Sequence, residues 1–192
     1  YQADMEAGPN YTGILYEERG RGMLALRGEK VRRTAQGGKE VTGKSAEEKD
    51  ILAAVRPDAW NEYVITAKGN HLIQKLNGVT TMELVDEEEK ARAMTGILAL
   101  QLHAGPPMTM RFRSIRLKRI PVDGFESLFD GSSLTGWKKH EGLADHGIAG
   151  KWFVEDGAIV GMQDPPGQGG FLTTLRKFRD FEVELETRID WP

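Results

Sequence analysis

WNEYVITAKGNHLIQKLNGVTTMELVD, residues 60–86, has the pattern of an antiparallel β-meander. In the first run, Tyr63, Ile65 and Ala67 alternate with Val64, Thr66 and Lys68, as expected for a strand with one buried face. Glycine-containing turns at 68–70 and 77–78 separate three such runs, and Asn-Gly favours a tight hairpin because both residues tolerate positive φ. This stretch therefore predicts three consecutive antiparallel strands.

The stretch ILALQLHAGPP, residues 97–107, predicts a further strand that stops before a glycine and two prolines. With a period of two, three leucines fall on one face, and Gln101 and His103 fall on the opposite face. A strand that buries leucines and presents an amide and an imidazole indicates a sheet with a functional surface.

Strand patterns continue towards the C-terminus. Residues 108–120 change parity near Ser114, which predicts a β-bulge. Residues 151–162 form a hairpin pattern with an Asp-Gly tip. In the final strand, three apolar residues alternate with Glu182, Glu184 and Glu186. These segments predict an all-β chain.

Residues 27–59 are the least β-like part of the sequence. The segment from 27 to 44 is polar, basic and glycine-containing, which favours a surface excursion. The following segment, 45–55, predicts a short helix capped by Ser45, with Glu48 three residues later as in a capping box. We expect this helix to end before Pro57.

Composition excludes several classes of function. The 192 residues include 26 basic and 29 acidic side chains, for a formal charge of −3, which is too balanced to indicate nucleic acid as a partner. No apolar run approaches the length of a membrane span, and we expect no membrane insertion and no signal peptide within these residues. Because cysteine is absent, disulfides, thiolate metal sites and cysteine nucleophiles are excluded.

Both ends of the sequence have the alternation of a strand. Strand-like residues stand at 1–5 and at 181–192. Exposed edge strands promote aggregation, so we expect these edges to meet each other or a partner chain or adjacent domain by strand exchange.

Together, six segments resemble the bacterial family of 3-keto-disaccharide hydrolases. They are FESLFDGSSLTGW (125–137), KWFVEDGAIVG (151–161), GGFLTTLRKFRDFEVELETRI (169–189), YQADMEAGPNYTGILYEERGRGML (1–24), WNEYVITAKGNHLIQKLNGV (60–79) and GILALQLHAGPPMTMRFRSIRLKRI (96–120). The resemblance implies a concanavalin/glucanase-like jelly-roll sandwich of two antiparallel sheets, with one or two short helices. It also implies a periplasmic or secreted bacterial protein.

The order of these segments differs from that of the family. Residues 1–120 resemble the C-terminal part of the jelly-roll domain, and residues 121–192 resemble its N-terminal part. The chain is then either a piece of a tandem pair or a circular permutant in which 121–192 completes one sandwich. A family segment of the Asn-Ser-Gly…Arg type, expected between the equivalents of Trp191 and Tyr1, is not found.

Candidate site residues follow from the strand alternation and from the chain ends, independently of the family resemblance. A jelly roll buries the inner faces of its sheets, and one outer face curves into a groove. Carboxylates, amides and an imidazole on such a face are the groups that bind sugar hydroxyls and move protons. The candidates are Gln101, His103, Gln2, Asp4, Glu17, Glu18, Glu182, Glu184 and Glu186.

The resemblance implies a reaction in which a carbonyl at C3 of the sugar acidifies the C2 proton. A base removes this proton, the C1 substituent leaves, and water adds to the enone. His103 is our first candidate for the base or acid, because free histidine titrates near neutrality. Asp4, Glu17 or Glu186 could be the base instead, or could hold a divalent cation that polarises the carbonyl. Gln101, Gln2, Glu18 and Glu184 would bind the substrate.

Two other classes of function remain open. The same sandwich could be a non-catalytic carbohydrate-binding module, or a structural domain of a larger exported protein, because fold alone does not separate these from an enzyme. A strip of spare aromatic side chains would favour the binding module. The sequence shows few aromatic residues outside core-like positions, which favours the enzyme.

Overall fold

The computed structural model of the chain describes residues 1–6, 8–141 and 148–190. Its secondary structure is almost entirely β, with a single short helix in the described part, as the sequence predicted. The elements are β1 (Gln2–Ala3), β2 (Leu15–Glu17), β3 (Gly22–Ala25), β4 (Glu29–Arg33), β5 (Lys39–Lys44), α1 (Glu48–Ala54), β6 (Asn61–Lys68), β7 (His71–Leu76), β8 (Val79–Asp86), β9 (Ala99–Leu102), β10 (Thr109–Arg119), β11 (Glu126–Ser127), β12 (Trp137–Lys139), β13 (Lys151–Glu155), β14 (Ala158–Met162), β15 (Gly170–Thr174) and β16 (Phe181–Asp190).

One ten-stranded sheet forms the larger layer of the sandwich, and we call it the main sheet. Its order is β13-β14-β10-β16-β6-β7-β8-β4-β5, with β11 paired to β10. The predicted meander is confirmed as β6-β7-β8, paired antiparallel throughout. The turn between β7 and β8 contains Asn77 (φ 47°) and Gly78 (φ 83°), as the Asn-Gly signal predicted.

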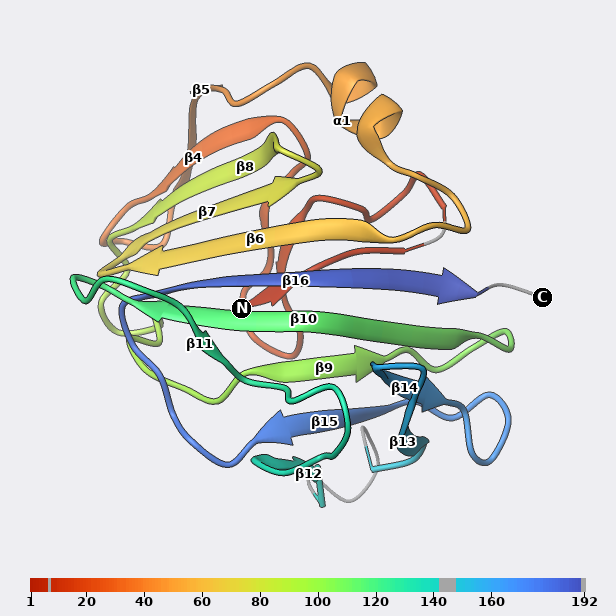
Figure 1. Cartoon of the computed structure of the whole chain (residues 1–192). Coiled ribbons are helices and arrows are strands. Elements are labelled where there is room, and N and C mark those ends of the chain that lie inside the picture. The colour runs from red at the N-terminus through yellow and green to blue at the C-terminus, as the bar shows by residue number, and fades with distance from the viewer. Residues whose placement is uncertain (7, 142–147, 191–192) are drawn as a thin grey trace.

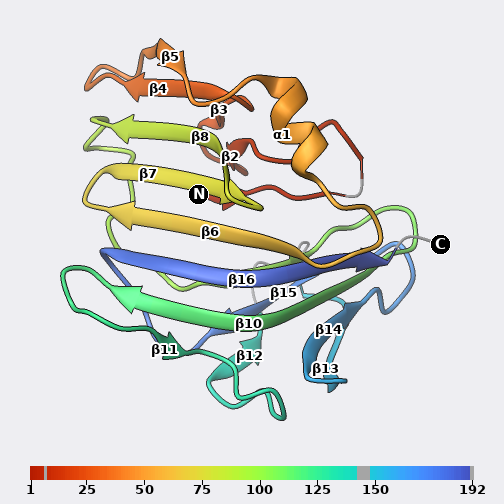
Figure 2. The ribbon, with the colours of Figure 1, turned by 45° about the horizontal axis from the view of Figure 1, so that its top comes forward.

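Two three-stranded sheets lie across one face of the main sheet (Figures 1 and 2). We call β12-β15-β9 the β9 sheet and β1-β2-β3 the β1 sheet. The predicted jelly-roll-like sandwich is therefore confirmed, but its second layer consists of two separate pieces.

Strands from 1–120 and 121–192 are interleaved in the main sheet and in the β9 sheet. In the main sheet, β16 lies between β10 and β6 (Figure 1). In the β9 sheet, β15 pairs with β9. The two parts of the sequence thus share both layers in this structure.

Local features of β10, β14 and β16 follow the sequence. The predicted bulge is confirmed by a register shift between Arg113 and Arg116, with Ser114 at φ 53°. The Asp-Gly tip predicted in residues 151–162 joins β13 to β14. In β16, Val183 faces the interior and its neighbour Glu184 does not, as the alternation predicted.

The prediction for residues 27–59 was partly wrong. Instead of a surface excursion, β4 and β5 form a hairpin that extends the main sheet, and β4 pairs with β8 in parallel. Their side chains are polar because this edge of the sheet is exposed, so hydrophobic alternation is weak there. The helix is confirmed, but its N-cap is Glu47 rather than Ser45, and no side chain caps it by a hydrogen bond.

The buried core forms two clusters, one under each small sheet. The larger cluster, which includes Leu100, Leu102 and Phe112, lies under the β9 sheet. The smaller one, which includes Leu15 and Met82, lies under the β1 sheet. No helix of the described residues is long and apolar enough to cross a membrane.

Candidate functional site

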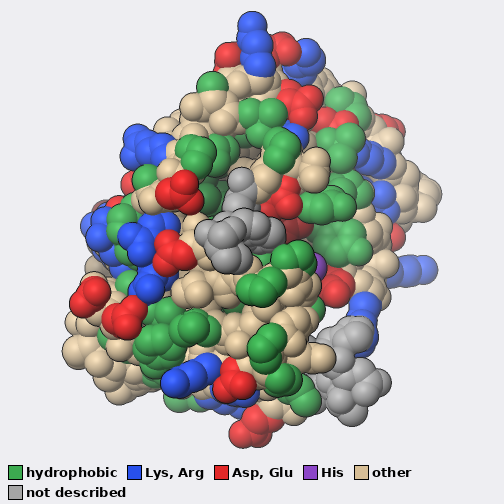
Figure 3. Space-filling view, turned by 90° about the vertical axis from the view of Figure 1, so that its right-hand side faces the viewer, with side chains coloured by type: hydrophobic (Ala, Val, Ile, Leu, Met, Phe, Trp, Pro, Cys, Tyr) green, Lys and Arg blue, Asp and Glu red, His purple; other side chains and the backbone are tan. Residues whose placement is uncertain are grey.

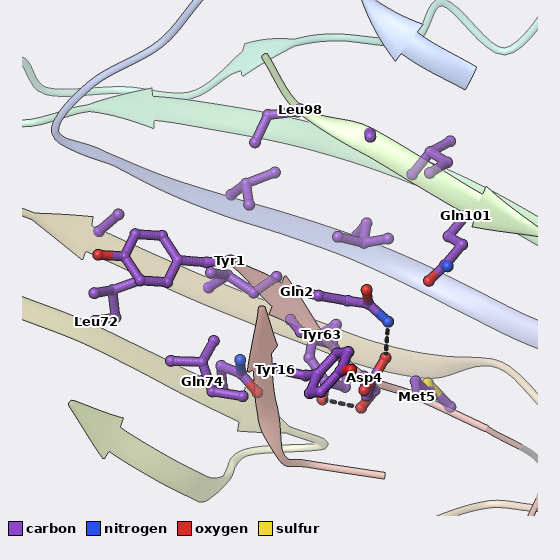
Figure 4. Close-up of a pocket in the computed structure, with 18 of the residues that line it drawn as sticks. Tyr1, Gln2, Asp4, Met5, Tyr16, Tyr63, Leu72, Gln74, Leu98 and Gln101 are labelled. Atoms are coloured by element: carbon purple, nitrogen blue, oxygen red, sulfur yellow. Dashed lines mark hydrogen bonds between the residues drawn. The ribbon is translucent and has the colours of Figure 1, made fainter. Parts of the chain in front are cut away.

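A cavity of about 970 Å³ lies between the two small sheets and the main sheet (Figure 4). Its floor is formed by inward-facing residues of the main sheet, such as Tyr63, Leu72 and Val183. The ends of β9 and β1 contribute its sides. The cavity is lined by members of both core clusters, such as Leu100 of the larger and Met82 of the smaller.

Five of the predicted site residues line this cavity. They are Gln2, Asp4, Glu18, Gln101 and His103. Gln2 and Asp4 come from β1 and the residue after it, and Gln101 and His103 come from β9 and the residue after it. On the face shown in Figure 3, a histidine side chain lies beside acidic and hydrophobic side chains. We call these five residues the mouth cluster.

Asp4 is the most strongly constrained member of the mouth cluster. Its carboxylate accepts a hydrogen bond from the Gln2 amide, and the Tyr63 hydroxyl donates to its backbone oxygen at 2.8 Å (Figure 4). Burial raises the pKa of the Asp4 carboxyl, while the Gln2 hydrogen bond and the nearby His103 act to lower it. Asp4 and His103 are therefore close enough to influence each other electrostatically.

His103 is positioned by the loop that follows β9. The Gln163 side chain donates to the His103 carbonyl at 2.9 Å and also to the carbonyls of Gly105 and Pro106. Gly169 passes so close that a Cβ there would lie 2.3 Å from the Leu102 oxygen. Gly169 and Gln163 thus hold the end of β9 in place, and with it the backbone that carries the His103 imidazole.

The burial of Asp4 predicts a pH-dependent stability effect. Since the pKa of Asp4 is raised above its ordinary 3.8, the folded chain holds this proton more tightly than the unfolded chain. The ionised carboxyl therefore costs stability at neutral pH. We expect Asp4→Asn to raise the free energy of unfolding at pH 7, with a gain that shrinks as the pH falls towards 3.8. Urea denaturation at pH 7 and pH 4 measures both, and an Asn variant less stable than wild type at pH 7 would contradict this account.

Glu17, next to Glu18 of the mouth cluster, does not line the cavity. It pairs with Arg21 at 2.6 Å, and Arg21 also contacts Asp86 at 2.8 Å and Glu88 at 3.3 Å. Partial burial acts to raise the pKa of Glu17, but the hydrogen bonds from Arg21 outweigh it and the pKa is lowered. Glu17 therefore belongs to an ion-pair network that ties the β1 sheet to the main sheet.

Glu184 and Glu186 lie on the opposite face of the main sheet from the cavity. Residues of the other parity on β16, such as Val183 and Leu185, line the cavity. Glu186 pairs with Arg113 at 2.9 Å, which lowers the pKa of its carboxyl, and Glu184 pairs with Arg116 at 2.6 Å. The structure thus does not bring these two glutamates to the mouth cluster, and neither does it bring Glu182, whose carboxylate accepts a hydrogen bond from Thr66.

The divalent cation that the sequence analysis left open has no ligand set among the described residues. Asp4, Glu17 and Glu186 stand in three different places, and the described residues contain no group of three His, Asp or Glu side chains that could hold a metal ion. We therefore assign no step of the chemistry to a metal.

Two buried polar residues at the cavity were not selected from the sequence. Tyr63 supports the backbone of Asp4, and burial raises the pKa of its hydroxyl. Gln74 is 1% exposed and lines the cavity, and its side-chain amide has no hydrogen-bond partner among the described residues. The sequence did contain a signal for Gln74. It has the same parity as Leu72 and Leu76 in β7, so it is a polar residue on an otherwise apolar face of the strand.

Two comparisons with known proteins indicate the same kind of protein. The family model described as the 3-keto-alpha-glucoside-1,2-lyase-like domain matches residues 1–118 and 124–192. A curated 3-keto-disaccharide hydrolase of Bacteroides thetaiotaomicron is 33% identical over 75 residues, which is 36% of this chain and 25% of the relative. The match thus spans a quarter of that relative's length. Because the family model matches nearly all of the sequence, the chain belongs to the 3-keto-alpha-glucoside-1,2-lyase-like domain family.

Proposed function

We propose that this chain carries the reactive surface of an enzyme that cleaves 3-keto-glycosides. The observation that carries the proposal is the meeting of His103 and Asp4 at the mouth of one cavity, beside two side-chain amides. A proton acceptor, a carboxylate and hydrogen-bond donors are the groups needed to remove a proton next to a carbonyl. Family membership supports the same chemistry, since the curated relative is named a 3-keto-disaccharide hydrolase.

The first step is proton transfer from C2 of the sugar to the imidazole of His103. The electron pair of the C2–H bond moves towards the C3 carbonyl and forms an enolate, and the nearby Asp4 carboxylate stabilises the imidazolium. Gln101 also lines the cavity, and in this proposal its amide donates a hydrogen bond to the developing charge on the C3 oxygen.

In the second step, the enolate re-forms the ketone as the C1–O bond breaks, leaving a C1–C2 double bond. The departing oxygen takes the proton held by His103. Water then adds at C1 and a proton returns to C2, so that the net reaction is hydrolysis. The Glu18 carboxylate and the Gln2 amide, on the β1 side of the mouth, would accept and donate hydrogen bonds to the sugar hydroxyls.

One observation favours the alternative of a non-catalytic carbohydrate-binding module. Tyr1 and Tyr11 line the cavity and are 40% and 56% exposed, so the cavity does have exposed aromatic side chains on which a sugar ring could stack. Such a module would bind sugars regardless of oxidation at C3.

The experiment that separates the two uses a matched pair of substrates. The chain is incubated with methyl 3-keto-glucoside and with unoxidised methyl glucoside, and methanol release and binding are followed by NMR. We expect release from the keto sugar alone, because only its C2 proton is acidic. Binding of both sugars without release from either would contradict the enzyme and support the binding module.

A further inference from the structure

The main sheet ends in two edge strands that differ in how readily each could accept another strand. β5 stands at one end and β13 at the other, where Figure 2 shows it beyond β14. Each pairs on one side only, β5 with β4 and β13 with β14, and within the described chain no strand occupies the other side. An edge strand is a template for pairing with a further strand unless its sequence opposes this.

The β5 edge has features that oppose such pairing. It is the polar segment Lys39–Lys44, and its register with β4 is interrupted by a shift. A second copy aligned antiparallel along the whole strand would place Lys39 opposite Lys44, and like charges directly opposite each other are destabilising. Irregular pairing and edge lysines are devices by which natural sheets avoid edge-to-edge association.

The β13 edge lacks this protection. Its register with β14 is unbroken, and its five residues, Lys151–Glu155, have the sequence KWFVE. Trp152 and Val154 pack against the larger core cluster, so the other three residues of the strand lie on the opposite face of the sheet. Phe153 is one of these three and is partly exposed. An apolar strand therefore stands unprotected at this end of the main sheet.

The turn after β13 shows which of its backbone groups are directed at the open side. The two-residue turn at 156–157 has φ values of 50° and 72°, as in a type I′ turn, so Glu155 just before it directs its carbonyl at β14. Successive residues of a strand direct their N–H and C=O groups to opposite sides. Trp152 and Val154 therefore direct theirs to the open edge.

The sequence of β13 is complementary to itself in the antiparallel direction. When two copies are aligned about a two-fold axis at Phe153, Trp152 of one copy stands opposite Val154 of the other, and both direct backbone groups towards each other. Lys151 then stands opposite Glu155, in a pair without backbone hydrogen bonds, where side chains come closest. Opposite charges at such positions stabilise strand pairing.

The charges at the ends of β13 are available for this alignment. Within the described residues Lys151 has no carboxylate partner, and its ammonium lies 5.4 Å from the ring centroid of Phe153. The Glu155 side chain is 48% exposed, and one of its oxygens accepts a hydrogen bond from Arg111 at 2.7 Å. The other oxygen has no partner in the described part of the chain. Each copy thus offers an ammonium and a carboxylate oxygen to the other.

We propose that β13 pairs antiparallel with β13 of a second copy of this chain, so that two main sheets form one continuous sheet across a two-fold axis. Backbone hydrogen bonds join Trp152 of each copy to Val154 of the other. Lys151 of each copy pairs with Glu155 of the other, and the two Phe153 rings meet at the axis. This dimer does not rest on the proposed function, because β13 does not line the cavity.

Sedimentation velocity over a range of concentrations tests the dimer. One short strand pair is at the small end of specific interfaces, so we expect a reversible monomer–dimer equilibrium with a dissociation constant of about 1–100 μM. Glu155→Lys and Lys151→Glu each place like charges at both ends of the strand pair. We expect each to weaken the dimer by about tenfold or more. Thermal unfolding shows whether each variant keeps its fold.

The same two variants test the register. Mixed in equal amounts, Glu155→Lys and Lys151→Glu restore opposite charges at both ends, so we expect a heterodimer to form at concentrations where each variant alone is monomeric. The double variant Lys151→Glu/Glu155→Lys should form a homodimer for the same reason. Lys44→Glu, at the β5 edge, is the matched control and should leave the dimer unchanged.

A single cysteine tests where the two-fold axis lies. The sequence contains no cysteine, and opposite residues of a pair without backbone hydrogen bonds have Cα atoms about 4.5 Å apart, which suits a disulfide. We expect Phe153→Cys to form a disulfide-linked dimer in a glutathione redox buffer, and Val41→Cys, on the exposed β5 edge, to remain monomeric. Equal cross-linking of the two cysteine variants would overturn the proposal. So would a wild-type chain that is monomeric at millimolar concentration, or a dimer that neither charge variant weakens.

Discussion

An Arg21→Met variant is expected to lose about 3 kcal/mol of unfolding free energy. The guanidinium lies 2.8 Å from the carboxylate of Asp86, whose side chain is 0% exposed, and it also pairs with Glu17. Removing one partner of a buried ion pair leaves the other charge without compensation, which costs more than the pair itself contributes. The Tyr1 hydroxyl also bonds to Asp86 at 2.6 Å, so that this network fixes the start of β1 as well.

The matched control for this variant is Arg32→Met. Arg32 pairs with Glu87 at 2.7 Å and with Glu40 at 3.3 Å, but these contacts are at the exposed edge of the main sheet. Exposed pairs contribute about 0–1 kcal/mol, so a small loss is expected. The double variant Arg21→Met/Asp86→Asn should recover part of the loss, because the buried charge is then absent. Urea denaturation measures all of these, and equal losses for Arg21→Met and Arg32→Met would show that Asp86 does not need Arg21.

A His103→Ala variant is expected to lower kcat on 3-keto-glucosides by about 10²–10⁴-fold. This is the typical contribution of a positioned acid–base group. KM should change much less, because the Gln101 and Gln2 amides, which we propose to bind the sugar, remain in place. Initial rates of methanol release over a range of substrate concentrations separate kcat from KM.

His71→Ala is the matched control for the histidine. His71 begins β7, pairs with Glu83 at 2.8 Å and does not line the cavity, so its removal should leave kcat within experimental error. Thermal unfolding of both variants shows whether the fold is retained. If a folded His103→Ala chain keeps a third or more of the wild-type kcat, His103 is not the base.

Much of the main sheet could be predicted from the sequence, because its central strands are long and bury one face. β6, β7, β8 and β16 alternate clearly, and their turns contain Asn-Gly or another glycine signal. The hairpin β4-β5 was missed because an exposed edge imposes no hydrophobic alternation. The parallel pairing of β4 with β8 joins strands far apart in sequence, and local patterns contain no information about such a pairing.

The site was predictable as a set of residue types, but its grouping was not. The alternation of β9 placed Gln101 on the face opposite the leucines, yet only the fold shows that β1 brings Gln2 and Asp4 to the same cavity. In β16 the alternation separated Glu186 from the apolar residues, but it could not show that the cavity lies on the apolar side. Glu17 and Glu18 are adjacent, and the sequence could not show that Glu17 pairs with Arg21, which also contacts the distant Asp86, while Glu18 lines the cavity.

The most direct measurement of the central claim is a kinetic isotope effect at C2. Methyl 3-keto-glucoside with deuterium at C2 is compared with the unlabelled sugar, and the wild-type rate of methanol release is measured for each under single-turnover conditions. If His103 removes the C2 proton before the C1–O bond breaks, the deuterated sugar should react several-fold more slowly. Equal rates, together with no incorporation of solvent deuterium at C2 during cleavage of the unlabelled sugar in D₂O, would show that the C2–H bond is not broken and would contradict the account.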